Sequence, residues 1–317
     1  MVPDIPRIAK INKISMENES IKISLVIPCF NESQGVAKTL DEILDHTSKL
    51  NGLEIIFVND GSTDETGKFL SERSAELHKV RYLENQFNQG YGASLKKGIL
   101  SAKGEIIVIT DADGTYPAEE IPKLLHLLKN CDMVVGARIG KNIRIPLIRR
   151  PAKWLLLKYA RWMSRADIKD LNSGLRAFRK AEALQFFHLL PQGFSFTSTI
   201  TLAMHIDGLN VVYHPIDYRK RLGKSSIRPI HDTLAFFTLV LKTTMYFRPL
   251  QVFGSLSVLF LITSLFIGIT GKLYFGAVPD VATVSLVSTG LIFLGLGLIG
   301  DLINTSFRIL RSQGKSD

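Results

Sequence analysis

Residues 106–113, IIVITDAD, decide the fold class of this chain. They predict a buried strand that runs into a loop carrying two carboxylates, Asp111 and Asp113. In open α/β sheets, ligands bind beyond the carboxyl ends of the strands. Paired carboxylates at such a place are hard oxygen ligands, suited to Mg²⁺ or Mn²⁺ carrying a diphosphate. The competing interpretation is a capped turn that opens a helix after Pro117.

Hydrophobic runs alternate with amphipathic segments on both sides of this stretch. Strands are expected at 21–28, 53–59, 80–84, 105–111 and 132–136, and helices at 32–50, 63–78, 92–103 and 117–129. Strands that alternate with helices predict parallel βαβ units with right-handed crossovers. The sequence therefore predicts an α/β domain over residues 21–228, preceded by a polar leader at 1–20.

Two long uncharged runs follow this domain. No charged residue occurs from 249 to 271 or from 281 to 300. Each run reaches the roughly 20 apolar residues needed to cross a bilayer core of about 30 Å. The sequence predicts membrane spans at 249–272 and 280–303, the second rich in glycine and suited to close helix packing. The alternative is a helical hairpin buried in a soluble core.

The flanking charges predict the orientation of these spans. Residues 1–20 lack the apolar core of a signal peptide, so we expect the large domain to stay in the cytoplasm. Basic residues precede the first span, and a basic tail at 304–317 follows the second. The positive-inside rule then places both termini on the cytoplasmic side of the cell membrane.

The net charge of +10 is concentrated in one segment. Residues 141–180 contain twelve Lys or Arg and two acids, Asp167 and Asp170. Such a patch suits nucleic acid, anionic lipid or a phosphate substrate. The two spans favour lipid, and no nucleic-acid motif is present. Residues 146–165 and 229–248 are expected to form amphipathic helices at the membrane interface, the alternative for the first being a helix packed on the sheet.

Four polar turns follow successive predicted strands, at 28–32, 60–64, 88–92 and 111–114. Carboxylates such as Glu32, Asp60 and Asp111 accept hydrogen bonds from ribose and base. Gly90 and Gly92 allow backbone N–H groups to approach a phosphate at a helix N-terminus. Together the turns predict one ligand crevice. The seven histidines show no metal-ligand spacing, and the two cysteines are expected to be small buried residues in a reduced compartment.

The order of these motifs resembles a known family. VIPCFNES, VNDGSTDET, NQGYGAS, TDADGTYP, GAR and NSGLRAFRK, within residues 23–226, are similar to family 2 glycosyltransferases. The closer resemblance is to polyprenyl-phosphate glycosyltransferases, the group that contains dolichyl-phosphate mannose synthase. This resemblance implies a GT-A fold with a mixed, mainly parallel sheet. It also implies a UDP- or GDP-linked sugar donor, a polyprenyl phosphate acceptor and a divalent metal, Mg²⁺ or Mn²⁺.

The resemblance assigns roles at the donor end of the site. The positions that match nucleotide-binding turns are Pro28, Asn31, Glu32, Asp60, Gly90 and Asp111. Asp111 and Asp113 match the motif that holds the metal and the diphosphate, and Asp113 is expected to be catalytic. Many members have a glutamine two residues later, where this chain has the shorter Thr115.

Other positions match the acceptor end. Arg138 matches an arginine at the acceptor phosphate and is expected to be catalytic. The other matching acceptor positions are Arg149, Lys153 in place of a serine, Ser173 and Arg176. Arg221 and Ser225 match a mobile loop that closes over the sugar diphosphate. Arg221 is expected to be catalytic and Ser225 to contact the acceptor phosphate. Lys224 precedes that serine, where the family has a lysine after it.

The residues also agree with the chemistry of such a transfer. A lipid monophosphate is largely ionised near neutral pH, because its second pKa is near 6. It therefore needs cations to orient it rather than a general base, and the planar guanidinium of arginine matches phosphate oxygens well.

The predicted function is thus a membrane-bound, inverting transfer of one sugar from a nucleotide to a polyprenyl phosphate. Two alternatives remain open. A processive polysaccharide synthase of the same fold usually has a Q-x-x-R-W motif, and residues 158–162 read KYARW. A non-catalytic membrane scaffold is the other alternative. The sugar, the nucleotide base and the lipid chain are not fixed by the sequence, and glycine-rich spans are compatible with a homo-oligomer.

Overall fold

The computed structural model describes residues 23–139, 166–219 and 248–313, with positions 158, 161, 162, 164, 238, 241 and 244–246. The leader, the loop around Arg221 and most of both predicted interfacial helices lie outside these residues. So do the predicted site residues Arg149, Lys153, Lys224 and Ser225.

A seven-stranded sheet forms the centre of the α/β domain, in the order β3-β2-β1-β4-β6-β5-β7. Its strands are β1 Ile23–Cys29, β2 Leu53–Asn59, β3 Val80–Glu84, β4 Ile106–Ile109, β5 Met133–Ala137, β6 Arg176–Arg179 and β7 Val211–Pro215. Only β6 is antiparallel to its neighbours, β4 and β5. The mixed, mainly parallel sheet is therefore confirmed. The strands β6 and β7 were not among the predicted ones, because the basic and loop-like sequence around them shows no alternation.

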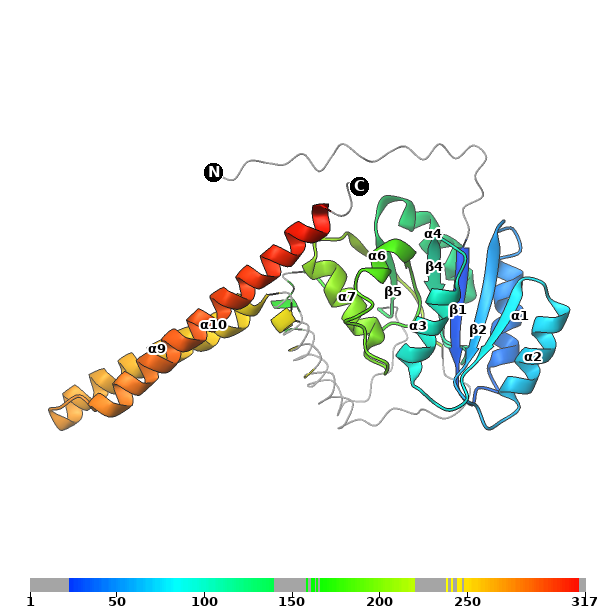
Figure 1. Ribbon diagram of the computed structural model, residues 1–317. Coiled ribbons are helices and arrows are strands. Elements are labelled where there is room, and N and C mark those ends of the chain that lie inside the picture. Colours follow the sequence, from blue (N-terminus) through cyan, green and yellow to red (C-terminus); the bar gives the residue numbers. More distant parts are fainter. Residues whose placement is uncertain are drawn as a thin grey trace.

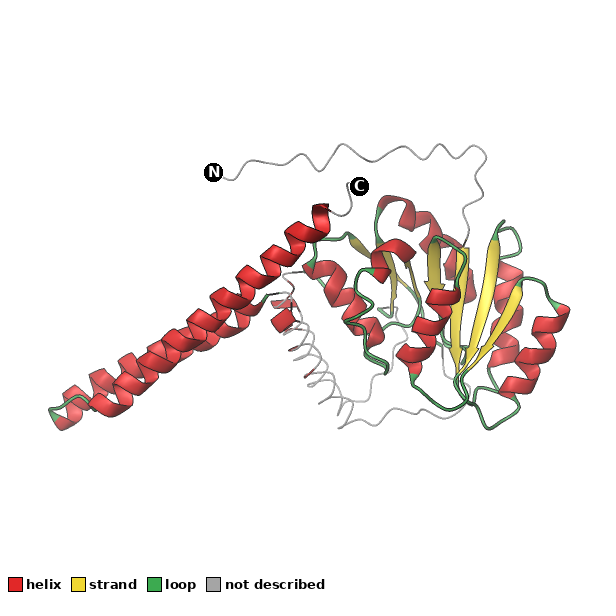
Figure 2. Cartoon of the chain, in the orientation of Figure 1, coloured by secondary structure: helices red, strands yellow, loops and turns green. Residues whose placement is uncertain are grey.

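Helices cover both faces of this sheet (Figure 2). One face packs against α1 Val36–His46, α2 Thr66–Glu76 and α4 Ile121–Leu127, with short 3₁₀ turns, η1 Ala118–Glu120 and η2 Leu128–Asn130, on either side of α4. The other packs against α3 Tyr91–Ser101, α6 Lys180–Leu184 and α7 Phe196–Ile206. Strand residues alternate between two apolar cores, and the fully buried Leu25 and Val26 belong to opposite ones.

Two long helices, α9 Pro249–Phe275 and α10 Asp280–Gln313, form an antiparallel hairpin that projects from the domain (Figure 1). Both contain a stretch long and apolar enough to cross a membrane, and only 11% of that stretch is buried. The helices lie where the two spans were predicted. Strong hydrophobic exposure of this kind is expected of helices that face lipid rather than a soluble core.

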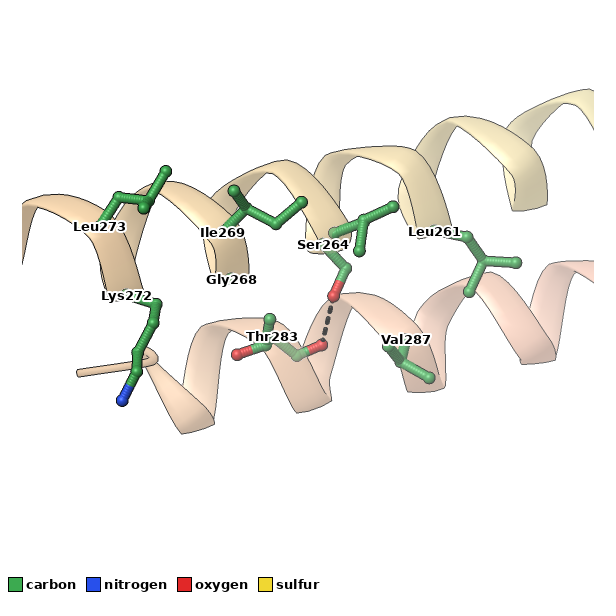
Figure 3. Close-up of a pocket in the computed structure, with 9 residues that line it drawn as sticks. Leu261, Ser264, Gly268, Ile269, Lys272, Leu273, Thr283 and Val287 are labelled. Carbon is green, nitrogen blue, oxygen red and sulfur yellow. Dashed lines mark hydrogen bonds between the residues drawn. The ribbon is translucent and has the colours of Figure 1, made fainter. Parts of the chain in front are cut away.

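Polar and small residues join the two helices of the hairpin. Ser264 Oγ donates a hydrogen bond to the carbonyl oxygen of Thr283 at 3.0 Å, beside an open apolar groove that includes Leu261 and Ile269 (Figure 3). A Cβ on Gly297 would lie 3.1 Å from Phe253. The small residues of α10 therefore allow close helix approach, as the sequence predicted.

The base of the hairpin touches the α/β domain. His188 Nε2 and the Tyr246 hydroxyl are 2.9 Å apart, and Gln251 Nε2 donates to the carbonyl oxygen of Trp162 at 3.2 Å. The face that carries α6 and α7 consequently lies next to the start of the first candidate span.

Candidate active site

The turns after β1 and β2 are joined by hydrogen bonds at the carboxyl end of the sheet. The Asn31 backbone N–H donates to Ser62 Oγ at 2.9 Å, and Asn31 Oδ1 accepts from the Thr63 N–H at 2.8 Å. Asn31 has a φ of 54°, a left-handed conformation that asparagine tolerates better than most residues. The exposed Asn31 and the mostly buried Glu32 thus lie at the edge where the nucleotide-binding turns were predicted.

Asp60 connects the second turn to the glycine-rich third turn. Its side chain is 3% exposed and accepts hydrogen bonds from Asn85 Nδ2, the Gln89 N–H and the Gly90 N–H at 2.7, 3.0 and 2.8 Å. Gly90 has a φ of 103°, which favours glycine. Asp60 therefore shapes the turn that contains Gly90, and its predicted contact with a nucleotide remains a prediction.

Asp111 is held between the third turn and the loop before β6. Its Oδ1 accepts a hydrogen bond from the Tyr91 hydroxyl at 2.9 Å. A Cβ on Gly174 would lie 2.7 Å from Asp111 Oδ2, so the backbone there packs directly against the carboxylate. Burial, followed by the negative charge of Asp111, raises the pKa of Tyr91 well above its usual value, and its hydroxyl stays a donor.

Asp113 lies deeper, with 3% of its surface exposed. Its Oδ1 accepts hydrogen bonds from the Thr115 N–H at 3.1 Å and from Thr115 Oγ1 at 2.6 Å. A Cβ on Gly35 would be 3.0 Å from Asp113 Cα, so the start of α1, just after the first turn, packs against the fourth turn. The predicted convergence of the four turns is confirmed by these contacts.

Arg138, just beyond β5, is oriented by Asp170. Its Nε and Nη2 donate to the two carboxylate oxygens of Asp170 at 2.8 and 3.0 Å, and its backbone N–H donates to the same group at 3.0 Å. The guanidinium also lies 5.3 Å from the ring centroid of Tyr218. Such a bidentate pair fixes the plane of the guanidinium.

Tyr116 and Tyr218, the tyrosine pair, connect the aspartates with Arg138. Their rings meet edge to face at a centroid distance of 5.3 Å. The Tyr116 hydroxyl accepts a hydrogen bond from the Gly174 N–H at 2.6 Å, and the Gly174 backbone packs against the Asp111 carboxylate. Burial raises the pKa of Tyr218, and the negative charges of Asp113 and Asp111 also raise it. One pair of rings therefore connects the loop packed against Asp111 with the arginine.

Ser173 and Arg176 lie below the surface of the site. Both are 0% exposed. Ser173 Oγ donates to the Gly136 carbonyl at 2.5 Å, and Arg176 donates to the carbonyls of Ser173 and Thr197 and to Thr201 Oγ1. Their positions support a role in holding the loop before β6 and do not offer a surface for direct phosphate contact.

Pro28 is also buried, inside β1, where it pairs in register with Val58. It is the penultimate residue of β1 and so precedes the turn to which the nucleotide-binding role was assigned. Arg149, Lys153, Arg221 and Ser225 lie outside the described residues.

The site also contains residues that the motif analysis did not single out: Tyr91, Asp170, Gly174 and Tyr218. Asp170 could have been identified from the sequence as a partner for a basic residue, because it is one of two acids in the strongly basic segment 141–180. Tyr91 and Gly174 belonged to quoted motifs but lacked a separate role, and nothing in the sequence distinguished Tyr218.

The carboxylates of Asp111 and Asp113 fit a divalent cation only with help from a ligand. Among the described residues, no group of three or more His, Cys, Asp or Glu could hold a metal. Mg²⁺ is commonly held by one or two carboxylates together with substrate phosphates. The donor set therefore fits a cation that arrives with a diphosphate.

Comparison with known proteins agrees with this geometry. The chain is 28% identical over 216 residues to the undecaprenyl-phosphate mannosyltransferase of Micrococcus luteus, which covers 65% of this chain and 88% of the relative. It is 28% identical over 312 residues to an undecaprenyl-phosphate 4-deoxy-4-formamido-L-arabinose transferase of Pectobacterium atrosepticum, which covers 92% of this chain and 90% of the relative.

A solved structure shows the same architecture. Glucosyl-3-phosphoglycerate synthase from Mycobacterium tuberculosis, crystallised with Mn²⁺, UDP-glucose and phosphoglyceric acid, aligns with a TM-score of 0.53 at 19% identity. The alignment covers 70% of this chain and 79% of that chain and identifies the α/β domain as a GT-A fold. The sequence profile described as Glycosyl transferase family 2 matches residues 24–186, more than half of the chain. The protein is a glycosyltransferase that belongs to this family.

Proposed function

We propose that the protein transfers one sugar from a UDP- or GDP-linked donor to the phosphate of a polyprenyl phosphate, with inversion at the anomeric carbon. Relatives named as undecaprenyl-phosphate and dolichyl-phosphate sugar transferases support this acceptor class. A phosphate oxygen of the lipid attacks the anomeric carbon, and the bond from that carbon to the diphosphate breaks.

The tyrosine pair carries the proposal. Tyr116 hydrogen bonds to the Gly174 N–H, which lies against Asp111, and Tyr218 lies against the Arg138 guanidinium. Two carboxylates suit a cation on a departing diphosphate, whereas an oriented guanidinium suits an attacking phosphate. Both requirements of a transfer from diphosphate to phosphate are therefore met within one site.

Asp111 and Asp113 form the donor end in this proposal. They would hold Mg²⁺ or Mn²⁺, which supplies electrostatic stabilisation of the departing diphosphate. Gly90 would shape this end, because its N–H is bonded to Asp60 and its φ of 103° sets the turn that starts α3. The turns that contain Asn31, Glu32 and Asp60 would bind the nucleoside.

The acceptor end needs charge and alignment rather than a base. The second pKa of a phosphate monoester is near 6, so the lipid phosphate is already largely ionised. Arg138, fixed by Asp170, would orient the attacking oxygen and offset the repulsion between the two phosphate groups. We also assign Arg149, Lys153 and Ser225 to the acceptor phosphate and Arg221 to the loop that closes over the sugar diphosphate. Ser173 and Arg176 would hold the loop before β6 in place.

The hairpin of α9 and α10 would anchor the enzyme where its lipid acceptor is found. We propose that both helices cross the cell membrane and that the catalytic domain and both termini are cytoplasmic, as the flanking basic residues favour. The contact of Gln251 with the carbonyl of Trp162 supports a short distance between the catalytic domain and the bilayer.

Incubation of purified protein and polyprenyl phosphate with a panel of nucleotide sugars tests this function. We expect a lipid phosphate that carries a single sugar, identified by mass spectrometry. A polymeric product would support a processive synthase instead. Absence of metal-dependent nucleotide binding in calorimetry would support a non-catalytic scaffold.

A further inference from the structure

Each carboxylate of the Asp111–Asp113 pair accepts a hydrogen bond from one hydroxyl of this chain. The Tyr91 hydroxyl donates to Asp111 Oδ1 at 2.9 Å, and Thr115 Oγ1 donates to Asp113 Oδ1 at 2.6 Å. The two donors come from different segments, the start of α3 and the loop after β4. Each therefore restricts one carboxylate independently of the other.

Thr115 is placed to support Asp113 and not to bind a cation itself. Thr115 is 0% exposed, and its hydroxyl donates to the Asp113 carboxylate. Its carbonyl oxygen accepts the Arg219 N–H at 3.0 Å, which holds the backbone in place. The short side chain at this position thus contacts the metal-site carboxylate from within the protein.

The side chain of Tyr91 is also held in place by its neighbours. Its ring stacks on Phe194 at a centroid distance of 5.6 Å and an interplanar angle of 19°. The next residues hold the same loop, because Ala93 N–H donates to the Gln192 carbonyl at 2.9 Å and a Cβ on Gly92 would overlap the carbonyl oxygen of Pro191. The hydroxyl of Tyr91 therefore has little freedom to leave Asp111.

We propose that Tyr91 and Thr115 are positioning residues that hold Asp111 and Asp113 in the orientation that binds a divalent cation with a nucleoside diphosphate. This inference rests on the proposed function. Hydrogen bonds from outer groups fix the orientation of ligating carboxylates, and their loss typically costs about 10- to 100-fold in metal affinity. The two donors hold the carboxylates at distances of 2.9 and 2.6 Å, so that removing either hydroxyl frees one carboxylate of the pair to rotate.

Calorimetry of the full-length protein in detergent tests this role without relying on turnover. UDP and GDP are titrated at increasing Mn²⁺ concentrations into the wild type, Tyr91→Phe and Thr115→Val. We expect the half-saturating Mn²⁺ concentration to rise about 10-fold in each variant. Nucleotide binding without metal should stay unchanged, because the turns that contain Asn31 and Asp60 are intact.

Matched variants separate positioning from general damage. Thr115→Ser keeps the hydroxyl and should restore the wild-type Mn²⁺ dependence. Tyr213→Phe and Thr47→Val remove hydroxyls bonded to His205 and to the Ile43 carbonyl, and both should behave as wild type. An unchanged Mn²⁺ dependence in both Tyr91→Phe and Thr115→Val, or an equal loss in the controls, would overturn the inference. Failure of the wild type to bind either nucleotide would instead refute the proposed function on which it rests.

Discussion

Asp170 and Arg138 form a bidentate ion pair at the edge of the site, with N–O distances of 2.8 and 3.0 Å. Asp170 is 3% exposed and also accepts the Asn172 backbone N–H at 3.1 Å. The pair therefore ties β5 to the loop before β6. It fixes the guanidinium plane before any substrate arrives, which reduces the reorganisation that a bound phosphate would require.

Arg138→Lys should lower kcat by about 100-fold, the order found when one preorganised donor is removed from a charged transition state. Lysine keeps the charge but not the planar fork. Nucleotide affinity should be unchanged, because we place Arg138 at the acceptor end. Steady-state kinetics with polyprenyl phosphate, together with nucleotide titration, measures both quantities. An unaltered kcat would contradict the role of Arg138.

Asp170→Asn should raise the KM for the lipid and lower kcat less than Arg138→Lys does. The amide keeps one acceptor oxygen but loses the charge and one of the two bonds to the guanidinium. The transfer rates of the two variants, measured as a function of lipid concentration, give both KM and kcat and test which variant loses more kcat. A larger loss for Asp170→Asn than for Arg138→Lys would show that Asp170 acts in another way.

Gly174→Ala should abolish transfer while the protein remains folded. The added Cβ would lie 2.7 to 2.9 Å from the carboxylate atoms of Asp111, so that side chain must leave its position. Gly193→Ala is the matched control, since a Cβ there meets no atom within 4 Å. Radiolabelled sugar transfer and thermal unfolding should separate the two variants. Normal transfer by Gly174→Ala would show that the position of Asp111 is unimportant.

The burial of His205 should make the folded protein less stable in mild acid. Burial lowers the pKa of His205 to about 4, from an ordinary 6.5, while Nε2 lies 2.9 Å from the Tyr213 hydroxyl. Between these two pH values the unfolded chain binds more protons than the folded chain. The free energy of unfolding is therefore fully retained above about pH 6.5 and falls as the pH drops towards 4.

The His205→Gln variant isolates this effect. Thermal unfolding of the wild type and the variant at pH 7 and pH 5 should show a smaller drop in Tm for the variant. Hydrogen bonds lower the pKa of Glu54 and Asp64 in spite of burial. The effect of these carboxylates on stability therefore falls below the range from pH 5 to pH 7. Equal drops in Tm would mean that His205 is not the group responsible.

Both cysteines should be unreactive in the folded protein. Burial, followed by the nearby negative charge of Glu32, raises the pKa of Cys29 well above 9, and burial raises that of Cys131 to about 11. Thiolate is the reactive form and is scarce at pH 8 under these conditions. Mass spectrometry after iodoacetamide should find no modification without denaturant and two modified cysteines in guanidinium. Rapid native alkylation would contradict the burial of these thiols.

The sequence predicted the elements with a clear hydrophobic period. The strands at 53–59 and 80–84 were predicted with the bounds that the structure shows, and the four helices predicted in the α/β domain were found within a few residues of their bounds. The helices α6 and α7 were not predicted. β6 was missed because its arginines, Arg176 and Arg179, hide a short buried strand in a basic run. Its burial depends on tertiary hydrogen bonds of Arg176, which no local pattern reveals.

The convergence of the four turns was also predictable, because the carboxyl ends of parallel strands share one edge. The partners of the site residues were not. Asp170 meets Arg138 across 32 positions, and Tyr91 meets Asp111 across 20. These long-range pairs depend on strand order and on loop packing, which sequence periodicity does not determine. Arg176 had the same charge as Arg138 in the sequence but lies inside the domain.

Transfer of a labelled sugar to polyprenyl phosphate by the wild type and Asp113→Asn, with and without a strong chelator, tests the central claim most directly. The expected product is a lipid phosphate with one sugar. It should form only in the untreated wild type, while Asp113→Asn retains a wild-type Tm. Equal turnover after chelation, or by Asp113→Asn, would contradict the claim that the paired carboxylates and a divalent cation drive departure of the nucleotide.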